Sequence, residues 1–417
     1  MWFDDPVDST GEKLVRAAAL FALWAVAKYY SLVVHVWKPN EYSDTYYYFL
    51  QAEQAAKGAG LAAMTPEYPT PAAALLMVPW WTGGTDYDTY RWNFLVLVVA
   101  IDAAFALLLA VRTGAGGLLA WTLFETLSGR LALLRFDVIP AILAATALLL
   151  ILQRRPNTAS PFVVAGAAVK LWPVLLFPLA LGERRHRLRA LAIGAVSASL
   201  VIVASVLAAG SERLLSPLTY QRERGLQIES VPATAAMIRR LTDPAYSIFW
   251  SQWNAYELEG PTVAAALQLA DLAAMVALGV LIALFVRWFL THTPLDAAGH
   301  LALFAIAAFM ATSKALSPQY VLWLAAPAAV LLGEAVDAPA RHRVRAAITT
   351  AWVAMLAVLT AYVYPLRYDE ILYANAPRPV LALAARNVLL VGFAAWAAWC
   401  AATATPRQHD RPKWVRP

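Results

Sequence analysis

Long apolar runs alternate with short polar segments along the whole chain. Several of them reach the roughly 20 residues that a helix needs to cross a bilayer. Membrane β-barrels instead show alternating segments of about ten residues, so the pattern predicts an all-α polytopic membrane protein. The runs cover 14–37, 92–112, 115–128, 136–152, 159–181, 188–209, 261–288, 298–313, 317–333, 346–363 and 379–402, with a shorter run at 71–81.

Composition agrees with this class of protein. The 417 residues are 61% hydrophobic and 14% charged, whereas soluble domains carry about 25% charged residues. The single cysteine, Cys400, excludes an intramolecular disulfide and a cysteine-based metal site. The acidic segment Met1 to Asp8 argues against a cleavable signal peptide. No nucleic-acid partner is expected.

The positions of the basic residues predict the topology, because cytoplasmic loops are rich in Lys and Arg. Arg154-Arg155 and the cluster at 184–189 flank one apolar run, which a simple span would place on opposite sides. That run is interrupted at Lys170-Leu-Trp-Pro173, and proline disrupts helix hydrogen bonding. We therefore predict a hairpin of two half-helices over 159–181 that returns to the cytoplasm.

The run at 71–81 is too short to span, and we interpret it as re-entrant from the outside. With these two assignments, the orientation rule predicts about ten full spans plus the hairpin, with both termini cytoplasmic. Residues 1–417 then form one integral membrane domain, and its largest outer loops are 38–91 and 210–260.

Basic residues on the predicted outer side run against the orientation rule. Arginine suits phosphate because its planar fork donates two hydrogen bonds. The alternatives are contacts with anionic lipid headgroups and ion pairs within the same loops. The residues are Arg130, Arg135, Arg213, Arg222, Arg224, Arg239, Arg240, Lys314 and Arg367.

Asp44 follows the first span and opens a tyrosine-rich segment that ends near Gly58. It could cap the helix that follows, although neighbouring Ser43 could do so instead. It could also act as a general base at the edge of the membrane. His35 lies near it, at the outer end of the first span.

Ionisable residues within spans are costly and often functional. A buried ion pair between spans is the simpler interpretation, and we favour it for Asp102 and Asp271. Lys170 differs because it lies at the break of the hairpin. The set is Lys28, Asp102, Glu125, Lys170 and Asp271.

Two further outer segments carry polar side chains. In Arg224-Gly-Leu-Gln-Ile-Glu-Ser230, Gln227 and Glu229 alternate with apolar residues, which suits sugar binding; alternatively, Leu226 and Ile228 pack on the membrane face. Ser313-Lys314 to Gln319-Tyr320 places a cation, an amide and a phenol at the outer end of a span, although an ordinary turn with an interfacial tyrosine also fits.

In their order along the chain, these features resemble the membrane-embedded GT-C glycosyltransferases, in particular family 87. The matching features are Asp44, Tyr68-Pro-Thr-Pro71, Lys170-Leu-Trp-Pro173, the 224–230 segment and Ser317-Pro-Gln-Tyr320. Thr70 departs from the family, which more often has a second proline there. The segment from Ser128 to Asp137 is also looser than in the family.

The resemblance implies an inverting transferase in the plasma membrane, with its active site on the extracytoplasmic face. The donor it implies is a polyprenyl-phosphate sugar, and family frequency favours mannose. Acceptors include a phosphatidylinositol mannoside, a lipoglycan or another cell-wall glycan. Asp44 becomes the predicted base. The predicted phosphate ligands are Arg135, Arg224, Lys314 and Lys170, and the predicted acceptor or sugar ligands are Gln227, Glu229, Tyr68, Gln319, Tyr320 and His35.

No cofactor and no obligate metal are expected, because a lipid monophosphate can be balanced by Arg and Lys. Asp86-Tyr-Asp88 is the only Asp-x-Asp spacing in the predicted outer loops. A secondary transporter or lipid flippase is the main alternative, since transporters also use broken helices at their binding sites. A non-catalytic scaffold is a third interpretation.

Overall fold

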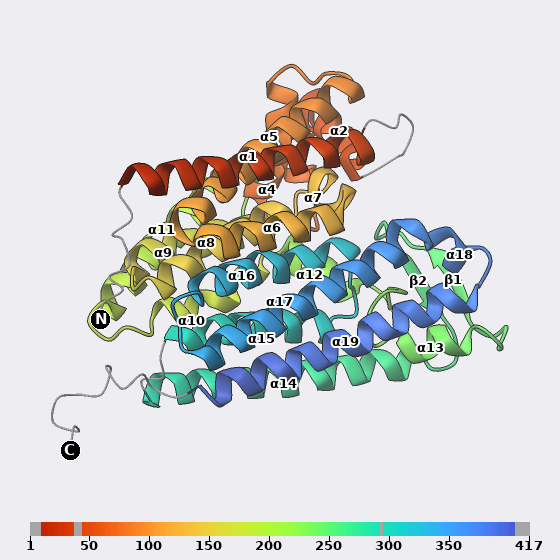
Figure 1. Cartoon of the computed structure of the whole chain (residues 1–417). Coiled ribbons are helices and arrows are strands. Elements are labelled where there is room, and N and C mark those ends of the chain that lie inside the picture. The colour runs from red at the N-terminus through yellow and green to blue at the C-terminus, as the bar shows by residue number, and fades with distance from the viewer. Residues whose placement is uncertain (1–9, 37–43, 292–294, 405–417) are drawn as a thin grey trace.

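In the computed structural model, which describes residues 10–36, 44–291 and 295–404, long helices lie side by side as a bundle (Figure 1). Ser43 and the basic tail from Arg407 onward fall outside these ranges. The helices of the first part are α1 (Thr10–His35), α2 (Asp44–Gln54), α3 (Gly60–Ala63), α4 (Thr70–Trp81), α5 (Tyr87–Arg112), α6 (Gly114–Ser128), α7 (Arg130–Leu134) and α8 (Val138–Leu152).

The remaining elements include one small sheet, which the all-α prediction missed. They are α9 (Pro156–Val169), α10 (Phe177–Ala180), α11 (Arg187–Ala209), α12 (Ser216–Glu223), α13 (Thr234–Arg239), β1 (Ser247–Trp250), β2 (Tyr256–Glu259), α14 (Val263–Thr291), α15 (Leu295–Thr312), α16 (Val321–Glu334), α17 (Ala340–Ala361), α18 (Tyr368–Leu372) and α19 (Pro377–Ala402). A π-helical turn at Ala55–Ala59 and short 3-10 turns at Trp172–Leu176, Glu212–Leu214 and Pro318–Tyr320 complete the chain, with a second π-helical turn at Tyr362–Leu366.

The predicted apolar runs coincide with these helices, but helix length does not support about ten full spans. Among the described residues, six helices are long and apolar enough to cross a membrane: α1, α5, α11, α14, α17 and α19. The runs at 136–152 and 317–333 form α8 and α16, in which nearly every residue is buried. A helix enclosed by other helices does not have to match the thickness of the hydrocarbon.

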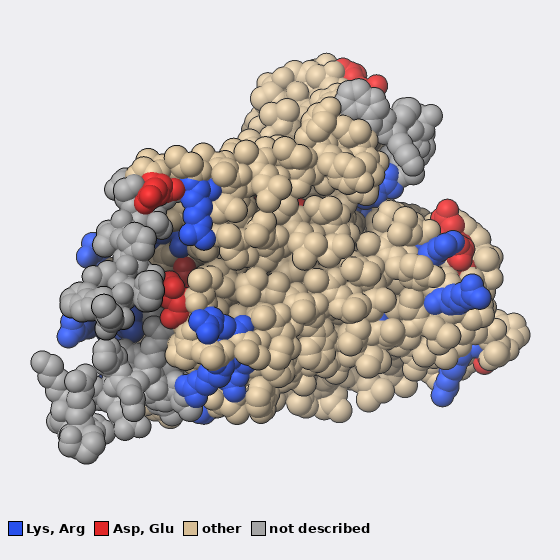
Figure 2. All heavy atoms as spheres, in the orientation of Figure 1, with Lys and Arg blue, Asp and Glu red and all other residues tan. Residues whose placement is uncertain are grey.

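The outside of the bundle is apolar where a bilayer would contact it. α11 and α14 are the least buried of the six long helices, with leucines such as Leu188 and Leu207 more than three-quarters exposed. Figure 2 shows the charged side chains gathered at the two ends of the visible face, with an uncharged band between them. This distribution is that of a multi-pass membrane protein.

We name the two ends of the bundle by their contents. The basic end holds the clusters at 154–155, 184–189 and 341–345. There Gln153 bonds Glu334, and Arg345 at the start of α17 bonds Thr403 after α19. The opposite end holds β1, β2, α13 and α18 (Figure 1). We call it the hairpin end after the β-hairpin of β1 and β2, which is distinct from the predicted hairpin of half-helices at 159–181. α1 begins and α19 ends at the basic end (Figure 1), so the basic clusters share one end, as predicted.

The predicted helix break is confirmed. α9 ends at Val169, and Lys170 adopts an extended conformation before the 3-10 turn that contains Pro173. Pro173 then packs against Gly166 of α9, and a Cβ atom at Gly166 would come within 3.0 Å of the proline ring. α10 continues along α9, so the chain reverses after Val169 instead of continuing across the bundle.

The 210–260 region folds onto the hairpin end. β1 and β2 pair antiparallel, with Trp250 opposite Tyr256. Leu226 and Ile228 are fully buried in a small core with Leu258, Val363 and Leu383. The alternative interpretation of these two side chains as membrane-facing is therefore wrong: they attach the loop to α19.

A buried ion cluster joins α1, α5 and α6 within the bundle. Lys28 lies 2.6 Å from Asp102 and 2.6 Å from Glu125. Trp121 donates to Asp102 at 2.7 Å and Trp24 donates to Glu125 at 3.2 Å. The interpretation of Asp102 as a partner in an ion pair is thus confirmed, whereas Asp271 lies exposed on α14.

Lys28→Met should destabilise the protein by about 3–5 kcal/mol, because it leaves two buried carboxylates without their cation. Unfolding in SDS–detergent mixtures measures this loss. Lys57→Met is the control, since Lys57 forms an exposed pair with Glu53, and it should change stability by less than about 0.5 kcal/mol. Equal losses for the two variants would contradict a stabilising role for the cluster.

Candidate active site

One face of α2 carries the predicted base toward the interior of the hairpin end. Asp44, Tyr47 and Tyr48 lie on this face because they are three and four residues apart. Asp44 is the first residue of α2 and forms an ion pair with Arg135. The opposite face packs Tyr46 and Phe49 against α4 and α5. The packing therefore fixes which way Asp44 points.

Arg135 lies in the short segment between α7 and α8. Its side chain is 16% exposed, compared with 30% for Asp44. The same guanidinium donates to the Tyr364 hydroxyl at 3.5 Å. A guanidinium carries five N–H donors, so Arg135 can hold Asp44 and still bind a second anion.

Lys170 occupies the break after α9 and pairs with Asp137, two residues after Arg135. The Lys170 Nζ atom lies 2.6 Å from Oδ1 of the buried Asp137. Trp323 donates to the same oxygen at 3.0 Å. A charge balanced in this way favours a structural role for Lys170 over its predicted contact with the donor phosphate.

Four aromatic rings surround the Lys170 ammonium. The rings of Tyr320 and Trp323 are centred 4.9 Å from Nζ, and those of Tyr68 and Phe136 are centred 5.3 Å from it. Such contacts stabilise a cation that is partly removed from water. Two predicted sugar ligands, Tyr68 and Tyr320, therefore both contact the Lys170 ammonium. Phe136 also contacts Tyr48 of α2, which joins this cage to the Asp44 face.

The structure explains several of the unexpected cations by local contacts. Arg213 donates to the carbonyls of Met64 and Thr65 and so fixes the loop before Tyr68. Arg240 donates to two carbonyls of α18. Arg367 pairs with Glu370 at the surface. These three arginines have structural partners.

Arg224 and Lys314, two predicted phosphate ligands, lie near enough for their charges to interact. The Lys314 ammonium donates to the Arg222 carbonyl at 2.7 Å, and the Arg224 guanidinium lies over the Tyr220 ring. Partial burial lowers the pKa of Lys314, and the charge of Arg224 lowers it further, although Asp271 and Glu257 oppose both effects. An anion between the two cations would relieve their repulsion.

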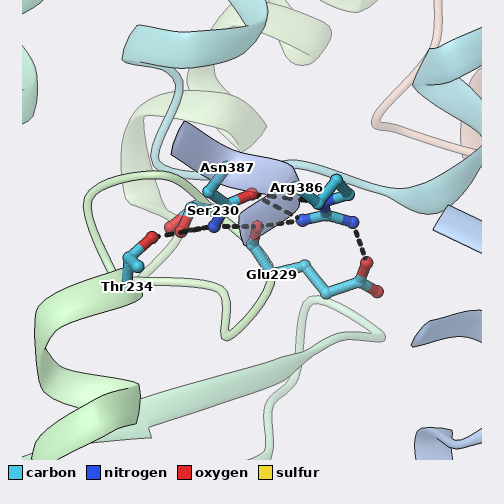
Figure 3. A network of polar contacts seen from close by, with 5 residues as sticks. All are labelled: Glu229, Ser230, Thr234, Arg386 and Asn387. Carbon is cyan, nitrogen blue, oxygen red and sulfur yellow. Dashed lines mark hydrogen bonds and ion pairs between the residues drawn. The ribbon is translucent and has the colours of Figure 1, made fainter. Parts of the chain in front are cut away.

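Glu229, a predicted sugar ligand, belongs to a buried network (Figure 3). Arg386 of α19 donates to its carboxylate at 2.8 Å and to its carbonyl at 2.5 Å. Asn387 donates to the Ser230 carbonyl and to the Thr234 hydroxyl. Burial raises the pKa of Glu229, and the charge of Arg386 counters that rise. These contacts favour a role in attaching the loop to α19.

The remaining predicted ligands are Gln227, Gln319 and His35. Gln227 and Gln319 are buried, and the Oε1 atom of each has no hydrogen-bond partner within the described structure. The Gln227 backbone N–H donates to the Lys314 carbonyl at 3.0 Å, which brings Gln227 beside Lys314. His35 ends α1 with its ring against Gly129, where a positive φ of 52° allows the chain to turn.

Asp86 has a structural explanation. Its side chain caps α5 by accepting hydrogen bonds from the backbone N–H and the hydroxyl of Thr89. These contacts explain the presence of Asp86, the first aspartate of the Asp-x-Asp spacing, without any ligand.

Two carboxylates near the site were not among the predicted ligands. Asp137 balances Lys170, and Glu67 precedes Tyr68 in the motif itself. Burial raises the pKa of Glu67, while a hydrogen bond from Tyr47 and the nearby charges of Arg224 and Arg213 partly oppose the rise. One Glu67 oxygen is buried without a partner in the described structure. The position of Glu67 beside Tyr68-Pro69 was the available signal in the sequence.

Glu67→Gln should stabilise the protein at higher pH and have no effect at low pH. The folded protein holds the Glu67 proton more tightly than the unfolded chain does, so wild-type stability falls as pH rises through the folded pKa. Melting curves from pH 4 to 8 should therefore separate the two proteins by roughly 2 °C or more at the upper end. Glu212→Gln, at an exposed glutamate, should show no such divergence, and parallel curves for Glu67→Gln would contradict the burial argument.

Comparison with known proteins identifies the family of the chain. A search of curated proteins finds no match to the chain. The family model of glycosyltransferase family 87 matches residues 65–318, a range that contains Tyr68, Arg135, Lys170, Arg224 and Lys314 and begins after Asp44. Because this match covers more than half of the 417 residues, the chain belongs to glycosyltransferase family 87.

Proposed function

We propose that this glycosyltransferase moves mannose from a polyprenyl-phosphate donor to a hydroxyl of a lipid-linked or cell-wall glycan. The observation that carries the proposal is the Asp44–Arg135 pair, which joins a carboxylate to a cation at the hairpin end. Family membership supplies the reaction class. The hairpin end then faces the outside of the plasma membrane, and the basic end faces the cytoplasm, as the orientation rule predicts.

Asp44 is the general base in this mechanism. Its carboxylate accepts the proton of the acceptor hydroxyl while the acceptor oxygen forms a bond to the anomeric carbon of the donor sugar. The bond from that carbon to the phosphate oxygen breaks, and its electron pair leaves with polyprenyl phosphate. A single displacement of this kind inverts the anomeric configuration. The ion pair with Arg135 orients the Asp44 carboxylate before the acceptor arrives.

Cations stabilise the leaving phosphate, which carries charge in the transition state. Arg224 and Lys314 lie close together, and neither forms an ion pair with a carboxylate in the described part of the chain. Arg135 has N–H groups to offer a phosphate beside Asp44. Lys170, in contrast, is balanced by Asp137.

A small apolar pocket of about 20 Å³, with room for roughly one water molecule, lies between α15, α16, α17 and α19. Leucine, methionine, valine and proline side chains form most of its wall, and its polar residues are Ser317, Thr360 and Arg386. Ser317 and Pro318 open the segment that carries Gln319 and Tyr320. The pocket therefore lies next to two predicted sugar ligands. Family membership supports a glycosyltransferase over the secondary-transporter interpretation.

Asp44→Asn should lower the transfer rate by at least about 100-fold, because the amide cannot accept the acceptor proton. The assay follows radiolabelled mannose from polyprenyl-phosphate mannose into glycolipid acceptors in detergent. Asp86→Asn is the matched control: Asp86 is an exposed helix cap, so transfer should stay near the wild-type rate. Full transfer by Asp44→Asn would rule out Asp44 as the base.

Arg224→Ala and Lys314→Ala should each raise the KM for the donor about tenfold, equivalent to ~1.4 kcal/mol of lost binding. The control is Arg367→Ala, whose partner is Glu370. Titration of the donor at saturating acceptor measures these constants. A donor KM unchanged in both single variants and in the double variant would exclude this pair from the phosphate site.

A further inference from the structure

A row of aromatic side chains leads from the surface of the hairpin end to the Asp44–Arg135 pair. We define this aromatic row as Trp250, Tyr256, Tyr368 and Tyr364, with Tyr373 at its side. Trp250 and Tyr256 are cross-strand partners whose ring centres are 4.9 Å apart. The next ring centres are separated by 6.0 Å, from Tyr256 to Tyr368, and by 5.0 Å, from Tyr368 to Tyr364.

Exposure decreases along the row toward the site. Tyr373 is 76% exposed and Trp250 is 59% exposed, whereas Tyr256, Tyr368 and Tyr364 are half-buried. At the inner end, the Tyr364 hydroxyl accepts a hydrogen bond from Arg135, which holds Asp44. The row therefore connects open solvent with the predicted base.

The hydroxyls of the row are held in place by the protein. Those of Tyr256 and Tyr373 lie 3.3 Å apart, and Tyr368 lies near enough to Glu229 for the charge of that carboxylate to act on its hydroxyl. Glu229 is in turn fixed by Arg386 of α19 (Figure 3). Leu258 and Ile371 pack beneath the row in the small core. The inner part of the row is thus packed against the protein, so its rings lose little conformational entropy when a ligand binds.

We infer that the aromatic row binds the sugar units of an oligosaccharide acceptor that follow its reacting hydroxyl. Sugar rings have apolar C–H faces and polar rims, and tyrosine and tryptophan combine an apolar ring with a polar group. The direction in which the bound oligosaccharide runs rests on the proposed function: its reacting sugar lies at Asp44, and its remaining sugars extend toward Trp250. An interfacial aromatic belt would follow the membrane plane, whereas this row ends at Arg135.

The test compares Trp250→Ala and Tyr373→Ala with Trp81→Ala. Trp81 is matched in residue type and in exposure, at 63% compared with 59% for Trp250, and it follows Trp80, which packs on α2. Tyr373→Phe keeps the ring and serves as the conservative variant. The acceptors are octyl mannoside and an octyl glycoside of a linear mannotetraose, assayed with one donor in detergent.

For the tetrasaccharide acceptor, Trp250→Ala and Tyr373→Ala should raise the KM about tenfold, equivalent to ~1.4 kcal/mol. The kcat and the KM for octyl mannoside should stay unchanged, because one sugar does not reach Trp250. Tyr373→Phe and Trp81→Ala should behave as wild type. The inference is overturned if the two alanine variants keep the wild-type KM for the tetrasaccharide, or if they change both acceptors equally. If the two alanine variants lose activity toward both acceptors equally, and only in nanodiscs, the row is a membrane anchor and the inference is likewise overturned.

A binding measurement separates this inference from the proposed function. Saturation-transfer NMR follows mannotetraose alone, without a donor, on the full-length protein in detergent. Trp250→Ala should weaken the signal and Trp81→Ala should not, whatever the donor of the reaction. If the wild type transfers sugar from no polyprenyl-phosphate donor and this difference persists, the proposed function fails and the aromatic row stands. Equal signals from the wild type and both variants would overturn the inference that the aromatic row binds sugars.

Discussion

The ion pair between Lys170 and Asp137 is the contact on which the candidate site depends. Asp137 is fully buried, and a lone carboxylate at that position would be strongly destabilising. Lys170 reaches one oxygen of Asp137 only because α9 ends at Val169 and the chain turns back at Pro173. The broken helix and the buried acid therefore require each other.

The consequences of this pair extend along the segment from Arg135 to Asp137. With Asp137 fixed, Phe136 completes the aromatic cage and packs on Tyr48 of α2. Arg135 then lies where it can bind Asp44, at the start of the same helix. The Lys170–Asp137 pair takes no part in the proposed reaction, yet it thus determines the position of Asp44, the proposed base. Preorganisation of this kind is what electrostatic catalysis requires.

The cations of the hairpin end divide by their partners. Arg213, Arg240 and Arg386 bind carbonyls or a buried carboxylate, and they attach loops to helices. Arg224 and Lys314 form no such ion pair within the described chain, and they lie near enough for Arg224 to influence the titration of Lys314. Arginine serves both purposes because its planar group can satisfy several acceptors at once. Residue type alone does not separate the two roles.

The sequence by itself determined the apolar helices, the break at Lys170–Pro173 and the position of Asp44 at the start of the segment that follows the first helix. These features are local: hydrophobic run length, proline geometry and the spacing of charges suffice to define them. Only the tertiary structure decided which helices are enclosed, that Asp44 pairs with Arg135, and that Glu229 belongs to a structural network. Arg135 and Tyr364 are 229 residues apart, and Glu229 and Arg386 are 157 residues apart. Contacts between such distant residues depend on how the helices pack, and a run of apolar residues specifies that a helix is buried without specifying its neighbours.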